Sequence, residues 1–174
     1  MNTISNIRVT QPEDLVALEA LYPLAFPEEN LLPVLRALHA GKSDVLSLVY
    51  FDEEIVGHVA FSECGTPEYP NKFSLLAPLA VSPSKQKQGI GSELARHGLQ
   101  ILSEKGVMKA FVLGDPNYYG RFGFEPEPGV LPPYELPTEW AAAWQSMALS
   151  DTAVNAHGKL MVSEPWQDPA LWAE

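Results

Sequence analysis

The chain of 174 residues has 46% hydrophobic and 19% charged residues and a formal net charge of −11. This balance is typical of one soluble globular domain and excludes a disordered chain. No apolar run approaches the roughly 20 residues that cross a bilayer, and the acidic excess argues against nucleic acid as a main partner.

The first residues show no basic region followed by an apolar one, so no signal peptide is expected. Cys64 is the only cysteine in the sequence, so no internal disulfide can form. Both features fit a cytoplasmic protein. The negative charge is compatible with a cationic substrate, although solubility alone also explains it.

Seven segments have the apolar pattern of β-strands. They are residues 4–9, 45–51, 55–61, 73–81 and 110–113, and in the tail 143–149 and 160–162. The second and third are joined by an acidic turn and predict a hairpin, hence an antiparallel pair. The fourth is more continuously apolar, which indicates burial on both faces.

Apolar residues at helical spacing predict three helices and one shorter helical segment. They cover residues 12–22, the stretch between Pro27 and Gly41, residues 90–104 and residues 117–122. Pro23 should stop the first helix, because proline disfavours a helical conformation in the residue before it. Gly106 should cap the third helix, and the strand after that helix should be parallel to the strand before it.

This order of elements predicts an α+β fold: a mixed, mostly antiparallel sheet flanked by helices, with one parallel βαβ unit. We expect a single domain over residues 1–174, with a core at 1–125 and a proline-rich, β-containing tail at 126–174. The four tryptophans of that tail are expected to pack it.

The turn Gln86-Lys87-Gln88-Gly89-Ile90-Gly91-Ser92 lies between an apolar strand and a helix. A helix N-terminus offers free N–H groups, and glycines let a phosphate approach the backbone, so the turn is a candidate pyrophosphate site. A simple tight connection is the alternative. The turn is neither a P-loop, because Gly-x4-Gly-Lys-Ser/Thr is absent, nor a dinucleotide fingerprint, because Leu94 replaces the third glycine.

With Leu79-Ala80-Val81 before it, the turn resembles the acetyl-coenzyme A (acetyl-CoA) signature of the Gcn5-related N-acetyltransferase (GNAT) superfamily, Gln/Arg-x-x-Gly-x-Gly/Ala. The segment from Asp115 to Phe124, DPNYYGRFGF, resembles the second motif of that superfamily. Its spelling is similar to the predicted bacterial acetyltransferases of the YhbS type. The resemblance implies the acyl-CoA N-acyltransferase fold, with acetyl-CoA as the co-substrate.

The resemblance also implies which residues contact the cofactor. They are Leu79, Ala80, Val81, Gln86, Lys87, Gln88, Gly89, Ile90, Gly91, Ser92 and Asn117. Pro78 supports a gap for the cofactor on independent grounds, because proline cannot donate to a sheet ladder and predicts a splay or bulge next to Leu79. An ordinary bulge without a ligand is the alternative. Lys85 would either add charge near the phosphates or merely solvate the loop.

By the same resemblance, Tyr119 would be the general acid that protonates the departing thiolate, with Tyr118 as the core residue of the pair. A thiol pKa of about 8.5 against a phenol pKa near 10 makes this transfer plausible. The strand 73–81 has no Asp, Glu or His to act as the base. Asp115 and Glu63 are the nearest candidates. The alternative role of Asp115 is a helix N-cap, and that of Glu63 is a solvated loop carboxylate. A water relay could also act in place of both.

The implied reaction moves an acetyl group to a primary amine by direct attack in a ternary complex. The acceptor would be a small-molecule or peptide amine, and a cationic one suits the net charge. Neither Cys64 nor the four histidines show a catalytic or metal-ligand spacing, so we expect no metal. We expect a monomer or homodimer without nucleic-acid or membrane partners. A non-catalytic (acyl-)CoA-binding module and a nucleotide-binding protein stay open as alternatives.

Overall fold

The computed structural model describes residues 5–150 and 155–173. These residues form two compact units. The first unit comprises residues 5–61 and 78–98, and the second comprises residues 62–77, 99–150 and 155–173. Each unit contains part of a mixed sheet together with helices, as the α+β prediction requires.

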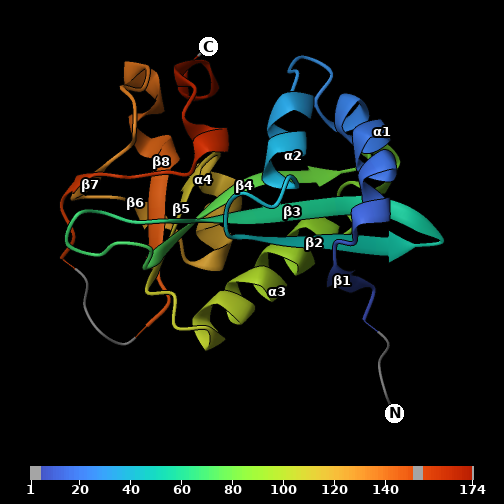
Figure 1. Ribbon diagram of the computed structural model, residues 1–174, viewed down its shortest axis with the longest axis horizontal. Coiled ribbons are helices and arrows are strands. Elements are labelled where there is room, and N and C mark those ends of the chain that lie inside the picture. Colours follow the sequence, from blue (N-terminus) through green and yellow to red (C-terminus); the bar gives the residue numbers. More distant parts are fainter. Residues whose placement is uncertain (1–4, 151–154, 174) are drawn as a thin grey trace. The chain divides into compact units, whose positions relative to one another are not determined.

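Four strands form the sheet of the first unit, in the order β1–β2–β3–β4 (Figure 1). Their bounds are β1 Ile7–Val9, β2 Val45–Asp52, β3 Glu54–Cys64 and β4 Phe73–Val81, and β3 and β4 continue into the second unit. β1 is antiparallel to β2, with Ile7 opposite Tyr50. All four predicted strands are confirmed, although β3 extends beyond its expected end, and residue 4 lies outside the described residues.

Three helices belong wholly or partly to the first unit: α1 Leu15–Ala25, α2 Leu32–Leu38 and α3 Ile90–Glu104. A 3-10 turn, η1 (Pro12–Asp14), leads into α1, and Gln11 and Asp14 form a capping box there. Figure 1 shows α1 and α2 side by side, in blue. Gly106, with a φ of 85°, follows α3 as predicted.

Pro23 does not stop α1, and this prediction is wrong, because the helix continues to Ala25. A proline removes one helical hydrogen bond and restrains the residue before it. That residue is Tyr22, which is only 1% exposed and whose hydroxyl lies 2.6 Å from Nδ1 of His58. Tertiary contacts therefore hold Tyr22 in the helix against the local preference.

Helices pack on both faces of the sheet in the first unit. Successive residues of a strand point to opposite faces, and Gly57 and His58 of β3 illustrate this. A Cβ on Gly57 would lie 3.0 Å from side-chain atoms of Ile90 and of Leu94, so α3 packs closely on that face. His58 points to the other face, where its ring meets Tyr22 of α1. Elements on this second face share one core cluster: Leu18, Leu21, Tyr22, Leu35, Val49 and Ala80.

The sheet of the second unit has the strand order β3–β4–β5–β8–β6. Its further strands are β5 Lys109–Leu113, β8 Trp144–Ala148 and β6 Glu125–Pro126. β5 is parallel to β4, as predicted, and antiparallel to β8. The parallel register covers only Phe73 to Leu75 of β4, whereas β8 pairs along the whole of β5. The parallel pairing is therefore short and ends before Pro78.

The tail contains a second, two-stranded sheet and three 3-10 helices. β7 (Val130–Leu131) runs parallel to β9 (Gly158–Lys159), and the helices are η4 Thr138–Ala143, η5 Glu164–Trp166 and η6 Pro169–Trp172. The predicted strand 143–149 is confirmed as β8. The predicted strand 160–162 is wrong, because Met161 forms only an isolated bridge, to Gly65. The backbone of residues 160–162 bonds to two different segments of the chain, so no continuous ladder forms there.

Tryptophans fasten the tail, as predicted for three of the four. The ring of Trp144 stacks on Phe111 at 5.4 Å and meets Trp172 edge to face at 5.9 Å. The indole N–H of Trp166 donates to Oγ of Ser62 at 3.1 Å. Trp140 is only half-buried.

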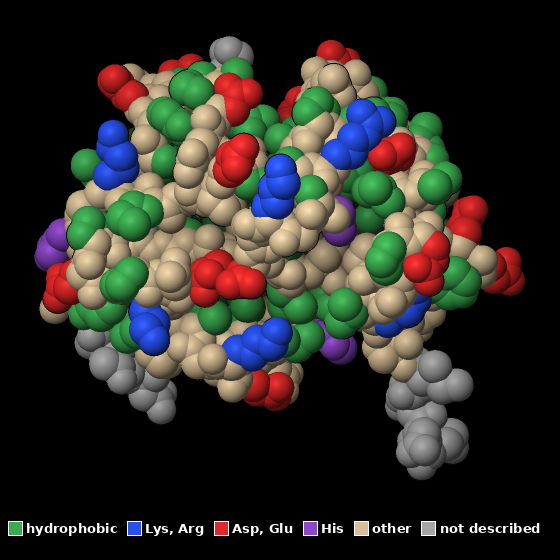
Figure 2. Space-filling view, in the orientation of Figure 1, with side chains coloured by type: hydrophobic (Ala, Val, Ile, Leu, Met, Phe, Trp, Pro, Cys, Tyr) green, Lys and Arg blue, Asp and Glu red, His purple; other side chains and the backbone are tan. Residues whose placement is uncertain are grey.

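The surface of the described residues carries charges of both signs. Figure 2 shows Lys and Arg side chains scattered among acidic and apolar ones on the face in view. Within the described ranges, the helices are too short or too polar to cross a membrane.

Candidate active site

The predicted pyrophosphate turn joins β4 to α3 in the first unit. A 3-10 turn, η2 (Pro83–Lys85), follows the strand, and residues 86–89 lead into the helix at Ile90. Lys87 and Gly89 have left-handed backbones, with φ of 64° and 84°. This conformation costs energy for a residue with a Cβ and little for glycine, so the path of the turn explains the glycine at position 89.

Gly89 is the N-cap residue of α3, because its carbonyl accepts the first helical hydrogen bond, from N of Glu93 at 3.0 Å. A Ser, Thr or Asp at this position would satisfy N–H groups of the first turn with its side chain. Glycine has no side chain to do so, and none of the described residues accepts a hydrogen bond from the N–H groups of Ile90, Gly91 and Ser92. These groups are therefore available to an anion, which the helix dipole also favours.

Leu79, Ala80 and Val81 form the end of β4, beside this turn. Ala80 is buried and its two neighbours are half-buried. The side-chain amide of Gln86 donates to the carbonyl of Val81 at 3.1 Å and so ties the turn to the strand. The register of β4 with β5 already ends at Leu75, which agrees with the interruption that Pro78 predicted.

Lys85 has a partner of its own in the first unit. Its Nζ lies 3.7 Å from Oδ2 of Asp52, and both side chains are exposed. This ion pair favours the solvated-loop alternative for Lys85. Lys87 is exposed within the turn itself.

The second motif lies in the second unit, directly after β5. Helix α4 (Pro116–Tyr119) runs into the 3-10 turn η3 (Gly120–Phe122), and the chain leaves it at Gly123 with a φ of 108°. The helical segment predicted at 117–122 is therefore confirmed. Asp115 is its N-cap, because Oδ1 of Asp115 accepts a hydrogen bond from N of Asn117 at 2.9 Å.

The ring of Tyr119 lies against the backbone of Gly114. A Cβ on Gly114 would lie 2.4 Å from Cε2 of that ring, so only glycine leaves room for it. The ring also meets Phe122 and the buried Phe124, at centroid distances of 6.2 and 5.9 Å. Burial raises the pKa of Tyr119, with a smaller contribution from Tyr118. The phenol is therefore protonated at neutral pH and can donate a hydrogen bond.

The prediction that Tyr118 is the core residue of the pair is wrong. Cζ of Arg121 lies 4.5 Å from the centroid of the Tyr118 ring, so this ring stacks under a guanidinium group. Both tyrosines are half-buried, and Tyr119 is the one that contacts the buried Phe124. A helix as short as α4 does not give one buried face and one free face.

The two candidate bases occupy different elements of the second unit. Asp115 is exposed, and one of its carboxylate oxygens is engaged as the helix cap. Glu63 is half-buried and lies inside β3, so it is not the loop carboxylate of the alternative interpretation.

Cys64 is 3% exposed. Burial, and to a lesser extent the charge of Glu63, raises the pKa of its thiol, so the reactive thiolate does not form. Within the part of the chain that the structure describes, no three His, Cys, Asp or Glu side chains gather as a metal-ligand set.

The two units divide the predicted site residues between them. The first unit brings residues 86–92 together with residues 79–81 through the bond between Gln86 and Val81. The second unit contains Tyr119, Asp115 and Asn117, and also Glu63.

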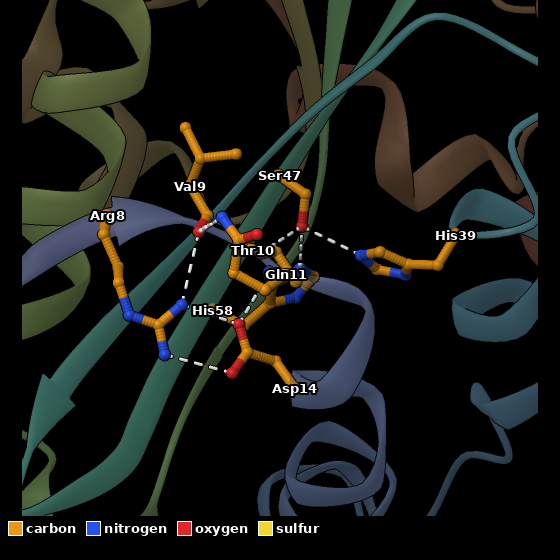
Figure 3. A network of polar contacts seen from close by, with 8 residues as sticks. All are labelled: Arg8, Val9, Thr10, Gln11, Asp14, His39, Ser47 and His58. Carbon is orange, nitrogen blue, oxygen red and sulfur yellow. Dashed lines mark hydrogen bonds and ion pairs between the residues drawn. The ribbon is translucent and has the colours of Figure 1, made fainter.

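The sequence patterns did not reveal a buried polar cluster in the first unit, which we call the histidine network (Thr10, Tyr22, His39, Ser47 and His58). Figure 3 shows Ser47 between Thr10, His39 and His58. Its hydroxyl oxygen lies 2.7 Å from Oγ1 of Thr10, 2.9 Å from Nε2 of His39 and 2.7 Å from Nε2 of His58. A serine and a histidine inside otherwise apolar strands are the only signal in the sequence.

His58 is fully buried at the centre of this network. Burial, together with the nearby ring of His39, lowers the pKa of His58 to about 3. The ring is therefore neutral at physiological pH and has one N–H donor and one nitrogen acceptor.

A pocket of about 320 Å³ opens where α1 ends and α2 begins. Tyr22 of the histidine network is part of its wall. Apolar side chains and two carboxylates line the rest, including Phe26, Leu31, Glu28 and Glu29. Such a lining suits an organic cation.

Comparison with known proteins decides the family. The sequence model of the acetyltransferase (GNAT) family matches residues 13–124. The chain belongs to this family. Two relatives from Escherichia coli K12, both named uncharacterized N-acetyltransferases, are each 32% identical to it. The match to YjhQ spans 150 residues, 83% of this chain and 82% of YjhQ, and the match to YhbS spans 154 residues, 86% of this chain and 90% of YhbS.

Solved structures of GNAT acetyltransferases have the same fold. The Escherichia coli YhbS structure in complex with CoA matches with a TM-score of 0.84 and 28% identity, over 97% of this chain and 96% of YhbS. A GNAT acetyltransferase from Brucella melitensis in complex with acetyl-CoA matches with a TM-score of 0.76 and 29% identity, over 92% and 97% of the two chains. The predicted fold, the resemblance to the YhbS type and the prediction of an acyltransferase enzyme are thereby confirmed.

Proposed function

We propose that this acetyltransferase binds acetyl-CoA and transfers its acetyl group to a primary amine by direct attack in a ternary complex. The glycine-capped start of α3 carries the proposal, because it leaves the N–H groups of residues 90–92 for an anionic ligand. Membership of the GNAT family, and two relatives solved with CoA or acetyl-CoA, support the same donor.

In this proposal the pyrophosphate of CoA accepts hydrogen bonds from the backbone of residues 86–92. The pantetheine arm pairs with Leu79, Ala80 and Val81 as an added strand would. An N–H group of that strand would also donate to the thioester oxygen as negative charge develops there. Asn117, exposed at the start of α4, would complete the contacts.

The amine nitrogen attacks the thioester carbonyl, the carbon–sulfur bond breaks, and the thiolate leaves. Tyr119 would act as the general acid toward that sulfur. Its raised pKa keeps the phenol protonated before the reaction but also opposes full loss of the proton. We therefore expect a hydrogen bond from Tyr119 to stabilise the thiolate first, with proton transfer completed as the product leaves.

The acetyl group would pass to the amine without an acyl-enzyme intermediate. Cys64 is the only cysteine, and its buried, protonated thiol is a poor nucleophile. Direct attack needs no nucleophile from the protein. It needs only a deprotonated amine held close to the thioester.

The acceptor we propose is a cationic small molecule or peptide that carries a primary amine. The net charge of −11 attracts cations in general. The pocket between α1 and α2 adds two local carboxylates, Glu28 and Glu29, beside apolar walls. Asp115, Glu63 or a water relay would then accept the proton of the ammonium group.

Gly89→Ala tests the anion site. Alanine at a φ of 84° is strained by roughly 1–2 kcal/mol, and the start of α3 is expected to shift. The Kd for CoA, measured by titration calorimetry, should rise about tenfold, which corresponds to about 1.4 kcal/mol. Gly106→Ala is the matched control, because Gly106 also has a positive φ and open space at its Cβ but follows the other end of α3. Equal CoA affinity in the two variants would contradict the proposed site.

Tyr119→Phe tests the acid. We expect kcat, measured as thiol release with a panel of amines, to fall about 10²-fold. The Kd for CoA should stay unchanged. Tyr118→Phe is the neighbouring control and should keep the wild-type kcat. Binding of CoA without transfer to any amine would favour a non-catalytic module over the proposed enzyme.

A further inference from the structure

The hydrogen bonds of the histidine network have only one consistent direction when both rings are neutral. Nδ1 of His39 lies 2.8 Å from the carbonyl oxygen of Leu35, so this nitrogen must carry the proton and donate. Nε2 of His39 then accepts, and the hydroxyl of Ser47 must donate to it. With its only proton used, the oxygen of Ser47 can only accept, from Thr10 and from His58.

The same reasoning continues to the far end of the network. Nε2 of His58 donates to Ser47, so Nδ1 of His58 is an acceptor. The hydroxyl of Tyr22, 2.6 Å away, therefore donates to it. The protons thus all point one way, from Tyr22 through His58 and Ser47 to His39.

Tyr22 places one end of this network in the wall of the pocket that we propose for the acceptor. It lines the pocket between α1 and α2, and it shares a core cluster with Ala80 of β4. Ala80 is the middle residue of the segment that we assign to the pantetheine arm. An amine bound in that pocket is therefore beside Tyr22.

His39 forms the opposite end and differs from His58 in exposure. His39 is half-buried, whereas His58 is fully buried. Burial therefore opposes a positive charge on His58, and the network ends at His39, next to solvent. The ring centroids of the two histidines are 5.4 Å apart.

We propose that Tyr22, His58, Ser47 and His39 form a proton relay that takes the proton of the acceptor amine and holds it on His39 during acetyl transfer. The inference rests on the proposed function and supplies the base that strand β4 lacks, in place of Asp115, Glu63 or a water relay. These four residues are outside the predicted site, and all belong to the first unit.

The relay moves one proton and leaves no charge on its three buried residues, Tyr22, His58 and Ser47. The ammonium proton passes to the oxygen of Tyr22 as the phenol proton passes to Nδ1 of His58. The proton on Nε2 of His58 passes to Ser47, and the hydroxyl proton of Ser47 passes to Nε2 of His39. His39 becomes an imidazolium ion, and the other three residues end neutral. After the product leaves, the reverse path returns the proton to water in the pocket.

Two ion pairs lie on elements next to the relay, and the pocket beside Tyr22 also contains the carboxylates of Glu28 and Glu29. Nη1 of Arg8 lies 2.7 Å from Oδ2 of Asp14 on the side of Thr10 (Figure 3). On α2, Nε of Arg36 lies 2.9 Å from Oε1 of Glu19 of α1. Arg8 and Arg36 therefore each have a carboxylate partner close by.

His39→Gln is the principal test. Glutamine can donate to Leu35 and accept from Ser47 but cannot take up a proton. At pH 7 we expect kcat to fall about 10²-fold with the KM for acetyl-CoA unchanged. The deficit should shrink as the pH rises, because more of the amine is then already deprotonated. Tyr22→Phe, which removes the first hydroxyl, should show the same pH dependence.

His97→Gln is the matched control, because His97 is an exposed histidine of α3 outside the network. It should keep the wild-type pH profile. Wild-type kcat in His39→Gln at pH 7, or a deficit of the same size at every pH, would overturn the relay. If the unaltered enzyme acetylates none of the amines, the proposed function fails. The relay is then tested by the positions of the protons on His58 and His39.

Nitrogen NMR of the unaltered protein reads those protons without turnover or mutation. At neutral pH, His58 should carry its proton on Nε2 and His39 on Nδ1. When acid protonates His39, the chain should reverse, and the proton of His58 should move to Nδ1. A proton on Nδ1 of His58 at neutral pH, or no change of tautomer when His39 is protonated, would overturn the relay whatever the turnover.

Discussion

Each unit buries a polar cluster, and these two clusters are of opposite kinds. The histidine network of the first unit consists of neutral rings and hydroxyl groups. The second unit buries an ion pair, in which Nζ of Lys109 lies 2.5 Å from Oε1 of Glu127. Both side chains are largely buried, with 11% and 1% exposed.

The ion pair is bonded on every side. Glu127 also accepts hydrogen bonds from the hydroxyl of Ser146 and from N of Gly129 and of Val130. Burial alone would raise the pKa of Glu127, but the bonds from Lys109 and these donors outweigh it, and the pKa is lowered. A saturated carboxylate of this kind fixes the start of the tail, whereas a neutral network can exchange the positions of its protons. The ion pair therefore suits a structural role, and the histidine network suits proton transfer.

Lys109→Met should have the largest effect on stability, because it leaves the Glu127 carboxylate buried without its cation. We expect the free energy of unfolding, measured with urea, to fall by about 3–5 kcal/mol. The double variant Lys109→Met with Glu127→Leu is the control and should lose less, because no buried charge is left over. A loss below about 1 kcal/mol in the single variant would show that the pair behaves like a surface pair.

Ser47→Ala should have the next largest effect. It leaves the N–H of His58 and the acceptor nitrogen of His39 without a partner, and an unsatisfied buried polar group costs about 1–3 kcal/mol. Urea unfolding measures the loss. Ser84→Ala removes an exposed hydroxyl that bonds only Ser82 among the described residues, and it should leave the free energy of unfolding unchanged. If Ser47→Ala and Ser84→Ala had the same free energy of unfolding, water would have taken over the hydrogen bonds of the Ser47 hydroxyl.

The two clusters should respond to acid in different pH ranges. The pKa of His58 is about 3 in the folded protein, below the ordinary value of about 6.5 for histidine. The unfolded chain therefore binds this proton first, and stability should fall by about 1.4 kcal/mol per pH unit below pH 6.5. Glu127 also has a lowered pKa, so its contribution is present above the ordinary range of a carboxylate and is lost only at lower pH.

Urea titrations at pH 7 to 4 separate these contributions. Between pH 6.5 and 5, the free energy of unfolding should depend less on pH in His58→Gln than in the unaltered protein. In Glu127→Gln its pH dependence over this range should stay the same. The opposite result would assign the acid sensitivity to the ion pair.

Arg36→Gln should have the smallest effect. Arg36 and Glu19 form an ion pair with side chains 56% and 33% exposed, where water screens the attraction. We expect the melting temperature to stay unchanged, in contrast to both buried clusters. A clear decrease would indicate that this pair supports the α1–α2 contact.

Local patterns in the sequence determined the elements of the proposed donor site. The run 73–81, the glycine turn and the helix after it are each readable from neighbouring residues, and the structure places them at β4 and α3. The motif around Tyr119 was readable for the same reason. Backbone conformation at a glycine or a helix cap depends on a few adjacent residues, so sequence alone identifies it.

Only the tertiary structure decided the features that depend on distant partners. Tyr22 stays helical before Pro23 because of His58, which lies 36 residues away in the chain. Glu127 is a buried ion because β5 brings Lys109 to it. The histidine network brings together Tyr22 of α1, Ser47 of β2 and His58 of β3 with Thr10 and His39. Contacts of this kind are made by packing, and no local period in the sequence records them.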